Sequence, residues 1–258
     1  MMAGFWALTG LGVTLGVILG LAALFLLVKA SPLAGQLLEI LPGYNCGACG
    51  SAGCAGYAEL LAGGKAALNL CAPGGADTGQ KIAALLGKEA AAVKEKNVVW
   101  IFCGGGVKAV DAYVYSGMHT CRAAMLVQGG YKKCRFGCLG FGDCSKVCQF
   151  GAIVMGEDGL PVIDRDKCLD CGACIRACPK GLLRRVVKKE LKLVLCSNHD
   201  RGPSARAVCA APCTACGLCV KNCPYQAIAL RDNLAVIDPA KCTNCGVCAG
   251  KCPTKAIA

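Results

Sequence analysis

Cysteine dominates the chemistry available to this chain, since 24 of its 258 residues are Cys. Most of them lie two or three residues from the next one. That spacing is poor for a disulfide between neighbours but suits a chain that wraps a metal. Thiolates select iron–sulfur clusters or zinc, and both indicate a reducing, cytosolic environment. The sequence therefore predicts several thiolate-bound metal sites rather than a disulfide scaffold.

Two cysteine runs near the C-terminus have the spacing of a bacterial ferredoxin, C-x2-C-x2-C-x3-C-P. In a two-cluster ferredoxin, the fourth cysteine of each run ligates the other cluster. Crossed ligation therefore predicts two 4Fe–4S clusters, one on Cys213, Cys216, Cys219 and Cys252 and the other on Cys223, Cys242, Cys245 and Cys248. Four thiolates leave no open iron site, which suits electron transfer rather than substrate chemistry.

An irregular run, C-x3-C-x5-C-x3-C, ends at Cys148 and is followed by Gln149 instead of proline. A regular run lies downstream, and the segment that joins the two runs resembles the segment between Cys223 and Cys242. The irregular run thus occupies the first half of another ferredoxin unit. Crossed ligation predicts clusters on Cys134, Cys138, Cys144 and Cys178 and on Cys148, Cys168, Cys171 and Cys174. A zinc site in the irregular run is the alternative, but it would leave Cys178 without a cluster.

A further four-cysteine module lies in the N-terminal half, in "GYNCGACGSAGCAGY" and "LCAPGG". Glycine and alanine fill its loop, so backbone N–H groups can approach cluster sulfurs closely. Zinc would also accept four thiolates. The crowded glycines favour a 4Fe–4S cluster on Cys46, Cys49, Cys54 and Cys71.

The segments "NVVWIFCGGG" and "LKLVLCSNHD" precede the two ferredoxin units, and each is a β-rich run that ends at a cysteine. A second cysteine follows each, so the chain contains two copies of a strand–Cys–helix–Cys–ferredoxin pattern. Four cysteines remain: Cys103, Cys121, Cys196 and Cys209. They could meet across the repeat and hold a sixth cluster. The alternative is that they are buried free thiols that pack as small hydrophobic groups, and the sequence leaves both open.

Residues Phe5 to Val28 carry no charge and would span roughly 36 Å as a helix, enough to cross a membrane. A signal peptide is the alternative, but no basic residue precedes the stretch. Lys29 and the basic segment after it place the C-terminal side in the cytoplasm. Gly12, Gly16 and Gly20 share one helix face, which predicts packing against another transmembrane helix.

The net charge of +12 invites a nucleic-acid interpretation, but no nucleic-acid-binding motif is present. Clusters explain the charge better, because each 4Fe–4S cluster with four thiolates carries about −2 when oxidised and six would contribute about −12. No motif for NAD, flavin, phosphate or substrate stands out. The basic surface is expected to dock an acidic electron carrier.

The "GYNCGACG" module, the "CRFGCLGFGDC" run and the ferredoxin loops together resemble the B subunit of Rnf complexes, the ion-translocating ferredoxin:NAD oxidoreductases of bacterial membranes. The resemblance implies a protein that accepts electrons from soluble ferredoxin and relays them to membrane partners that reduce NAD and export Na⁺ or H⁺. The alternatives are a SoxR-reducing complex, a hydrogenase or CO-dehydrogenase assembly, or a non-catalytic zinc or metal-storage scaffold.

The predicted fold class is α+β, with one transmembrane helix, a four-Cys module and two ferredoxin-like units in a duplicated arrangement. The predicted boundaries are residues 1–30 for the anchor and 33–92 for the module. The first repeat covers 97–190, with its ferredoxin unit at 131–185. The second covers 191–258, with its unit at 208–258. The anchor is predicted to be single-pass in the inner membrane, with the N-terminus outside and the cysteine domains on the cytoplasmic side.

Overall fold

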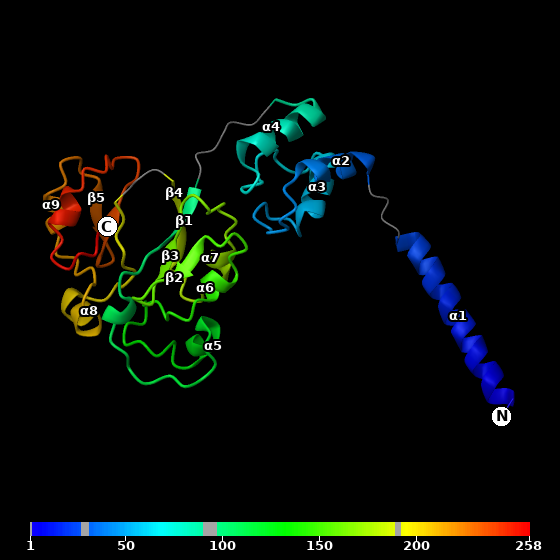
Figure 1. Ribbon diagram of the computed structural model, residues 1–258, viewed down its shortest axis with the longest axis horizontal. Coiled ribbons are helices and arrows are strands. Elements are labelled where there is room, and N and C mark those ends of the chain that lie inside the picture. The colour runs from blue at the N-terminus through cyan, green and yellow to red at the C-terminus, as the bar shows by residue number, and fades with distance from the viewer. Residues whose placement is uncertain (1, 27–30, 90–96, 189–191) are drawn as a thin grey trace.

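The computed structural model describes residues 2–26, 31–89, 97–188 and 192–258. Helix α1 (Met2–Leu26) projects away from the other described elements (Figure 1). Its stretch Gly4–Leu24 is long and apolar enough to cross a membrane, and none of it is buried. The predicted apolar helix is therefore present. The end of the predicted anchor, residues 27–30 with Val28 and Lys29, lies outside the described residues.

The four-Cys module is helical and has an apolar core of its own. Its elements are α2 (Pro32–Ile40), α3 (Cys54–Ala62) and α4 (Gly75–Leu86). Leu37, Tyr57, Leu61 and Ile82 are almost fully buried between them. The Tyr57 hydroxyl donates to the carbonyl of Ala67 at 2.7 Å, so the buried polar atom of this core has a partner.

Each ferredoxin-like unit is an antiparallel hairpin with two short helices. The first unit contains α6 (Asp143–Lys146), β2 (Ile153–Met155), β3 (Pro161–Ile163) and α7 (Ala173–Ala177). The second contains α9 (Leu218–Lys221), β5 (Ile228–Arg231), β6 (Leu234–Ile237) and α10 (Val247–Gly250). Ile153 pairs with Ile163 in one hairpin and Ile228 with Ile237 in the other, so branched apolar side chains of each pair face the cysteines.

A strand before each unit pairs with the segment that follows it. Strand β1 (Asn97–Ile101) runs antiparallel to β4 (Leu183–Val187), and the N–H of Phe102 donates to the carbonyl of Leu182 at 2.8 Å. In the second half, the N–H of Leu195 donates to the carbonyl of Ala256 at 2.8 Å, beside a bridge between Val194 and Ile257. Cys103 and Cys196 directly follow Phe102 and Leu195. Each of these cysteines therefore lies at the end of the pairing between the strand before a unit and the segment after it.

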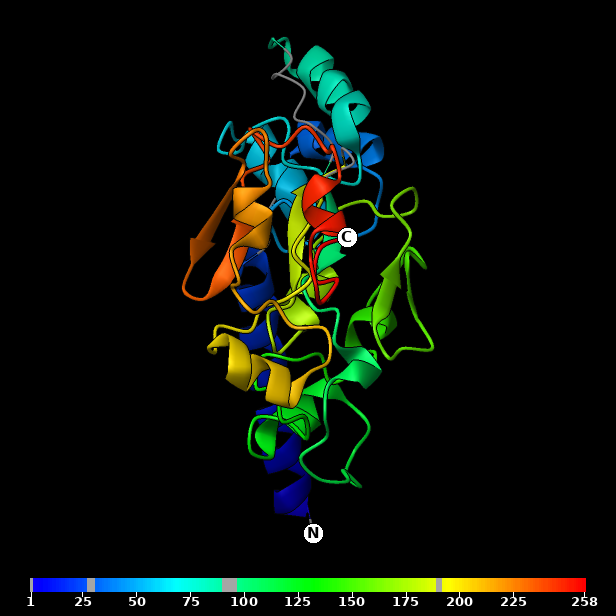
Figure 2. The same ribbon diagram turned by 90° about the vertical axis from the view of Figure 1, so that its left-hand side faces the viewer.

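The remaining described elements are η1 (Gly106–Lys108), α5 (Cys121–Leu126) and α8 (Gly202–Val208). A β-bridge joins Ala109 to Cys209, which ties the segment after η1 to the end of α8. Figure 2 shows the β2–β3 and β5–β6 hairpins on opposite sides of the β1–β4 ladder. The two units therefore share a connecting layer.

The described residues mix short helices with two-stranded sheets, as expected of an α+β chain. The predicted boundaries at residues 30, 92, 190 and 191 fall on the segments that the structure does not describe or at their edges. These boundaries remain predictions.

Candidate iron–sulfur cluster sites

All 24 cysteines lie in the described residues, and all are free thiols. Side chains around five cavities, together with the close neighbours of Cys174, divide them into six sets of four. The sets are numbered here as follows: set one, Cys46, Cys49, Cys54 and Cys71; set two, Cys121, Cys138, Cys144 and Cys178; set three, Cys148, Cys168, Cys171 and Cys174; set four, Cys213, Cys216, Cys219 and Cys252; set five, Cys223, Cys242, Cys245 and Cys248; and the bridging set, Cys103, Cys134, Cys196 and Cys209.

Four of the predicted groupings recur in the structure. Sets one, four and five each line one cavity with the same four cysteines that the spacing indicates. In set three, the charges of Cys171, Cys168 and Cys148 act on the Cys174 thiol, as does that of Cys144 from set two, so all these sulfurs lie close together. Set three consists of the four cysteines that line none of the five cavities. The fourth cysteine of each run in the second unit faces the cavity of the other run, as crossed ligation requires.

Set two differs from the predicted grouping at one position, because Cys121 and not Cys134 lines its cavity. Cys121 begins helix α5, whose N-cap Thr120 accepts from the N–H of Ala123 at 3.1 Å. The N–H of Arg122 donates to the carboxylate of Asp143 at 3.1 Å, and Asp143 immediately precedes Cys144. This contact holds the start of α5 against α6, so the Cys121 thiol reaches a cavity that lies 17 residues further along the chain, at Cys138.

The cavity of the bridging set likewise differs from the predicted sixth grouping at one position, because Cys134 and not Cys121 lines it. The cavity takes one thiol from the end of each strand segment, Cys103 and Cys196, and one from the bridge at Cys209. Cys134 is 7% exposed, and the amide of Asn198 lies 3.7 Å from its sulfur. The set therefore draws thiols from both halves of the chain.

Left-handed residues shape the loops in a repeated way. Asp170 and Gly172 flank Cys171, and Ala215 and Gly217 flank Cys216, all with positive φ. Successive turns of this kind aim backbone N–H groups into the concave side of a loop, where anions bind. The loop around Cys245 repeats the pattern with Asn244 and Gly246.

The segment after the last cysteine of each run also turns in the same way. The third residue after that cysteine has positive φ, and its N–H donates back to the carbonyl of the cysteine; these residues are Gly151, Gly181, Gln226 and Lys255. The irregular run thus leaves its loop by the same turn, although Gln149 stands in place of proline.

Backbone N–H groups are directed at sulfurs in several sets. Leu182, Ala227 and Ala256 donate to Cys178, Cys223 and Cys252 at 3.5, 3.4 and 3.3 Å. In each case the donor lies four residues after the cysteine. Hydrogen bonds to cluster sulfurs tune the reduction potential of an iron–sulfur site, so the repeated donor is part of the site's chemistry.

Burial raises the pKa values of these thiols, and neighbouring thiolates add to the effect. The pKa is raised to about 12 for Cys138 and Cys174 and to about 11 for Cys134, Cys144 and Cys219. Such thiols hold their protons at neutral pH unless bound metal stabilises the thiolate.

The donor sets fit 4Fe–4S clusters better than single ions. Among the described residues, no group of three or more His, Cys, Asp or Glu side chains stands close enough together to hold one metal ion. The cysteines instead stand around cavities, such as the one lined by Cys103, Cys134, Cys196 and Cys209 of the bridging set. Four separated thiols around a cavity with N–H groups directed at sulfur are the donor set of an iron–sulfur cluster.

Comparison with known proteins agrees with this chemistry. Residues 41–73 match a family described as a putative Fe-S cluster, residues 160–183 a 4Fe-4S binding domain, and residues 212–256 a 4Fe-4S dicluster domain. The chain is 42% identical over 228 residues to the B subunit of the Na⁺-translocating ferredoxin:NAD⁺ oxidoreductase complex of Acetobacterium woodii, covering 88% of this chain and 68% of that protein.

Two further relatives show the same extent of similarity. The B subunit of the ion-translocating oxidoreductase complex of Methanosarcina acetivorans is 43% identical over 232 residues, covering 90% of this chain and 88% of the relative. The B subunit of the proton-translocating ferredoxin:NAD⁺ oxidoreductase complex of Clostridium ljungdahlii is 42% identical over 233 residues, covering 90% and 82%. The chain belongs to the family of B subunits of ion-translocating oxidoreductase complexes.

Membership in this B-subunit family confirms the resemblance to Rnf complexes expected from the cysteine motifs. The matched families account for iron–sulfur chemistry in the module and in both ferredoxin-like units. None of these three family matches covers residues 97–159, where Cys103, Cys121 and Cys134 lie.

Proposed function

We propose that this chain is the membrane-anchored iron–sulfur subunit of an Rnf-type complex, which takes electrons from soluble ferredoxin and relays them to membrane partners that reduce NAD and translocate Na⁺ or H⁺. The observation that carries the proposal is the gathering of all 24 cysteines into six sets in a member of the B-subunit family. The six sets would each hold a 4Fe–4S cluster, which accepts and releases single electrons when bound.

The sets form one row through the molecule. Cys46 of set one lies close enough to Cys171 of set three for its charge to act on that thiol, and Cys144 of set two acts in the same way on Cys174 of set three. The N–H of Cys138 in set two donates to the sulfur of Cys103 in the bridging set at 3.5 Å. The bridging set therefore neighbours the first unit directly.

The row continues into the second unit. The backbone N–H of Cys213 in set four and its thiolate both act on the Cys196 thiol of the bridging set. Cys219 and Cys248, from sets four and five, are buried in one core. The order along the row is thus one, three, two, bridging, four and five, and without the bridging set the two units would have no thiolate site between them.

We infer that the two halves arose by duplication. The strand before each unit pairs with the segment after it in the same register, since Phe102 and Leu195 donate to Leu182 and Ala256, each four residues after the final cysteine of its unit. The duplicated strands supply Cys103 and Cys196 to the bridging set.

The second unit is proposed to receive the soluble ferredoxin. Of the 24 cysteines, all of them described, Cys216 and Cys245 are the exposed ones, so sets four and five lie nearest the surface. Residues 208–258 carry five basic side chains against two acidic ones, and Lys241 and Lys251 are exposed beside Cys242 and Cys252. A basic surface of this kind accelerates docking of an acidic carrier.

Helix α1 is proposed to anchor the chain in the cytoplasmic membrane, with the N-terminus outside. A methyl group added at Gly12, Gly16 or Gly20 would meet no atom within 4 Å beyond the helix's own backbone, so that face is open for a helix of a partner protein. The cysteine sets would then lie on the cytoplasmic side, where thiols stay reduced.

Iron and acid-labile sulfide in the anaerobically purified full chain test the proposal. Six occupied sets give about 24 iron per chain. Stoichiometric zinc, or fewer than about 12 iron, would contradict the electron-relay function. Reduction of the clusters by ferredoxin, followed by their visible absorbance, checks the direction of uptake.

A further inference from the structure

Asn198 stands out among the described residues as a buried polar side chain beside the bridging set. It is 2% exposed, and it follows Cys196 by two residues. A buried amide that lacked hydrogen bonds would destabilise the fold, so its partners indicate why the residue is there.

Both ends of the Asn198 amide have partners, and together they fix its orientation. The N–H of Asp200 donates to Oδ1 at 2.8 Å, so the oxygen must face Asp200. The Nδ2 group then faces the sulfur of Cys134 at 3.7 Å and donates to it. The backbone N–H of Asn198 also donates to the sulfur of Cys196 at 3.4 Å. One residue thus donates to two of the four thiols in the bridging set.

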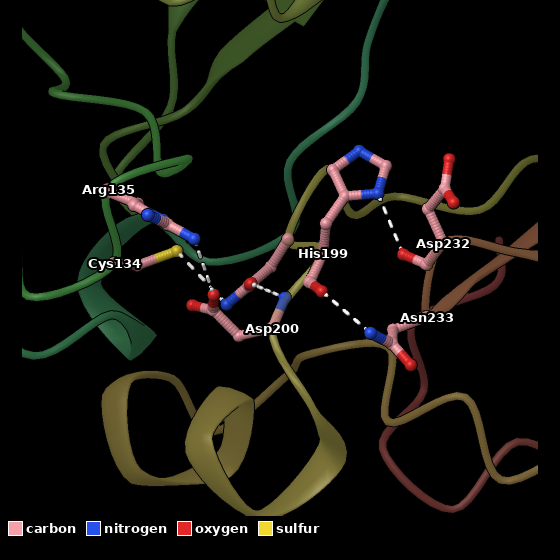
Figure 3. A network of polar contacts seen from close by, with 7 residues as sticks. Cys134, Arg135, His199, Asp200, Asp232 and Asn233 are labelled. Atoms are coloured by element: carbon pink, nitrogen blue, oxygen red, sulfur yellow. Dashed lines mark hydrogen bonds and ion pairs between the residues drawn. The ribbon is translucent and has the colours of Figure 1, made fainter.

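The segment that carries Asn198 is held from both sides. Figure 3 shows Asp200 paired with Arg135, at 2.9 Å, and His199 bonded to the turn at Asp232 and Asn233. His199 Nδ1 lies 2.9 Å from the Asp232 carbonyl, and Asn233 donates to the His199 carbonyl at 3.1 Å. Arg135 is adjacent to Cys134, whereas Asp232 and Asn233 belong to the β5–β6 turn. The amide is therefore fixed relative to both ferredoxin-like units.

The other described side-chain contact to a cysteine sulfur is of a different kind. Thr254 Oγ1 lies 3.6 Å from the sulfur of Cys252, but its hydroxyl donates to the Pro212 carbonyl at 2.7 Å. Its proton is therefore directed away from the sulfur. A neutral side-chain donor aimed at sulfur is thus a feature of the bridging set.

We propose that Asn198 is a positioning residue that orients Cys134 and raises the reduction potential of the cluster that the bridging set would hold. This inference rests on the proposed function, in particular on a cluster at the bridging set. Added electron density resides largely on the cluster and its sulfurs, so an N–H donor stabilises the reduced state more than the oxidised state. A higher potential at this position favours electron occupancy between the two units.

The test replaces the amide and measures potential rather than activity. Asn198→Leu has a similar volume and removes both N–H donors of the side chain. Asn198→Asp keeps the oxygen that accepts from the N–H of Asp200, but it places an acceptor instead of a donor at the Cys134 sulfur. This nearly isosteric variant provides the test if Asn198→Leu does not fold. Ser197→Ala is the matched control, since Ser197 is buried and directly follows Cys196 but donates to the Phe102 carbonyl at 2.9 Å.

Iron analysis of Cys209→Ser in the full chain first identifies the bridging cluster, and its EPR signal is obtained as the difference from the unmodified protein. Redox titration of that signal then compares the variants. We expect Asn198→Leu to lower the equilibrium constant for reduction about tenfold, which is about 59 mV for a one-electron couple. Asn198→Asp should lower it at least as far, and Ser197→Ala should leave it unchanged.

The outcomes separate the two proposals. If Cys209→Ser loses no iron, the bridging cluster and the role of Asn198 both fail. If Cys209→Ser loses about four iron but both Asn198 variants keep the wild-type potential, the bridging cluster stands and the role of Asn198 is overturned. An equal shift in Ser197→Ala would also overturn it, because the effect would then follow from any disturbance of the segment.

Discussion

In the second ferredoxin-like unit, every cysteine of the two runs lines one of the unit's own cavities, whereas the first unit directs Cys134 into the bridging cavity and fills the vacated position with Cys121. The hairpins and the turns after each run are otherwise alike. The difference shows how two ferredoxin-like units can be connected by a shared site. The first unit contributes Cys134 to the bridging set, and Cys121, which precedes the unit in sequence, completes set two in its place.

The two units also differ in how much of their core is cysteine. Four of the ten buried residues in the second core are Cys, against four of thirteen in the first. The first core includes the five-residue β1–β4 ladder, which the second replaces with one isolated bridge. The buried core of the four-Cys module contains no cysteine among its described residues. The stability of the fold should therefore depend least on bound iron in the four-Cys module, more in the first ferredoxin-like unit and most in the second.

Removing iron with an anaerobic chelator should have the largest effect. We expect the second unit to lose its fold, because an isolated hairpin with so small a core is marginal in water. The first unit should keep part of the β1–β4 ladder, and helices α2 to α4 should stay protected. Amide hydrogen exchange measures all three regions in one sample. Equal protection of the two hairpins after chelation would contradict the comparison.

Paired cysteine substitutions test the exchange of Cys121 and Cys134 directly. Cys134→Ser combined with Cys209→Ser removes two ligands of one set and should cost about four iron per chain. Cys134→Ser combined with Cys138→Ser removes one ligand from each of two sets and should cost about eight. The grouping expected from the spacing alone predicts the reverse, so the iron content of the two double variants decides between them.

Charge reversal should separate the units by function. Lys241→Glu with Lys251→Glu should slow the association of reduced ferredoxin roughly tenfold at low salt, and the effect should shrink as salt screens the charges. Lys133→Glu with Lys146→Glu changes the charge of the first unit equally and should have little effect. Stopped-flow reduction at several ionic strengths provides the measurement. Similar slowing by both pairs would place the docking surface elsewhere.

The smallest effect is expected from matched glycines. Gly142 and Gly217 both have positive φ, +74° and +76°, at the start of the helices that carry Cys144 and Cys219. Alanine should cost about 1 kcal/mol at either position from the left-handed backbone. An added Cβ at Gly142 lies 3.2 Å from Met155, whereas at Gly217 the nearest atom is 3.9 Å away in Leu230. Anaerobic denaturant titration should therefore show a larger loss of unfolding free energy for Gly142→Ala than for Gly217→Ala. Equal losses would show that the Met155 side chain moves aside without cost.

Much of the site could be predicted from the sequence, because ferredoxin ligands are close together along the chain. The spacing of the runs indicated the same partners that line the cavities of sets four and five. Likewise, the strand-like segments before Cys103 and Cys196 were expected to be equivalent, and both thiols line one cavity. Local turns fix these positions, so a local pattern is enough to find them.

The exchange of Cys121 and Cys134 could not be predicted in this way. It depends on the contact between Arg122 and Asp143, which brings α5 to α6, and on the Asn198 segment, which meets Cys134 from 64 residues away. Neither contact has a spacing signature. The widened gap after Cys134 was the available signal, since three residues instead of two separate it from Cys138. That gap showed that the run was altered without showing where its first thiol lies.

The bridging set also has a consequence for the order in which the protein is assembled. Its cysteines span residues 103 to 209, and two of them are positioned by strands that close only when a complete unit has folded. Sets one, two and three need no residue beyond Cys178, so they can be filled while the chain is still being synthesised. The bridging site is completed only after Cys209 has been synthesised. A cluster bound there therefore indicates that both halves of the chain have folded and are in contact. Stepwise reconstitution with iron and sulfide should show its signal appearing after those of sets one to three.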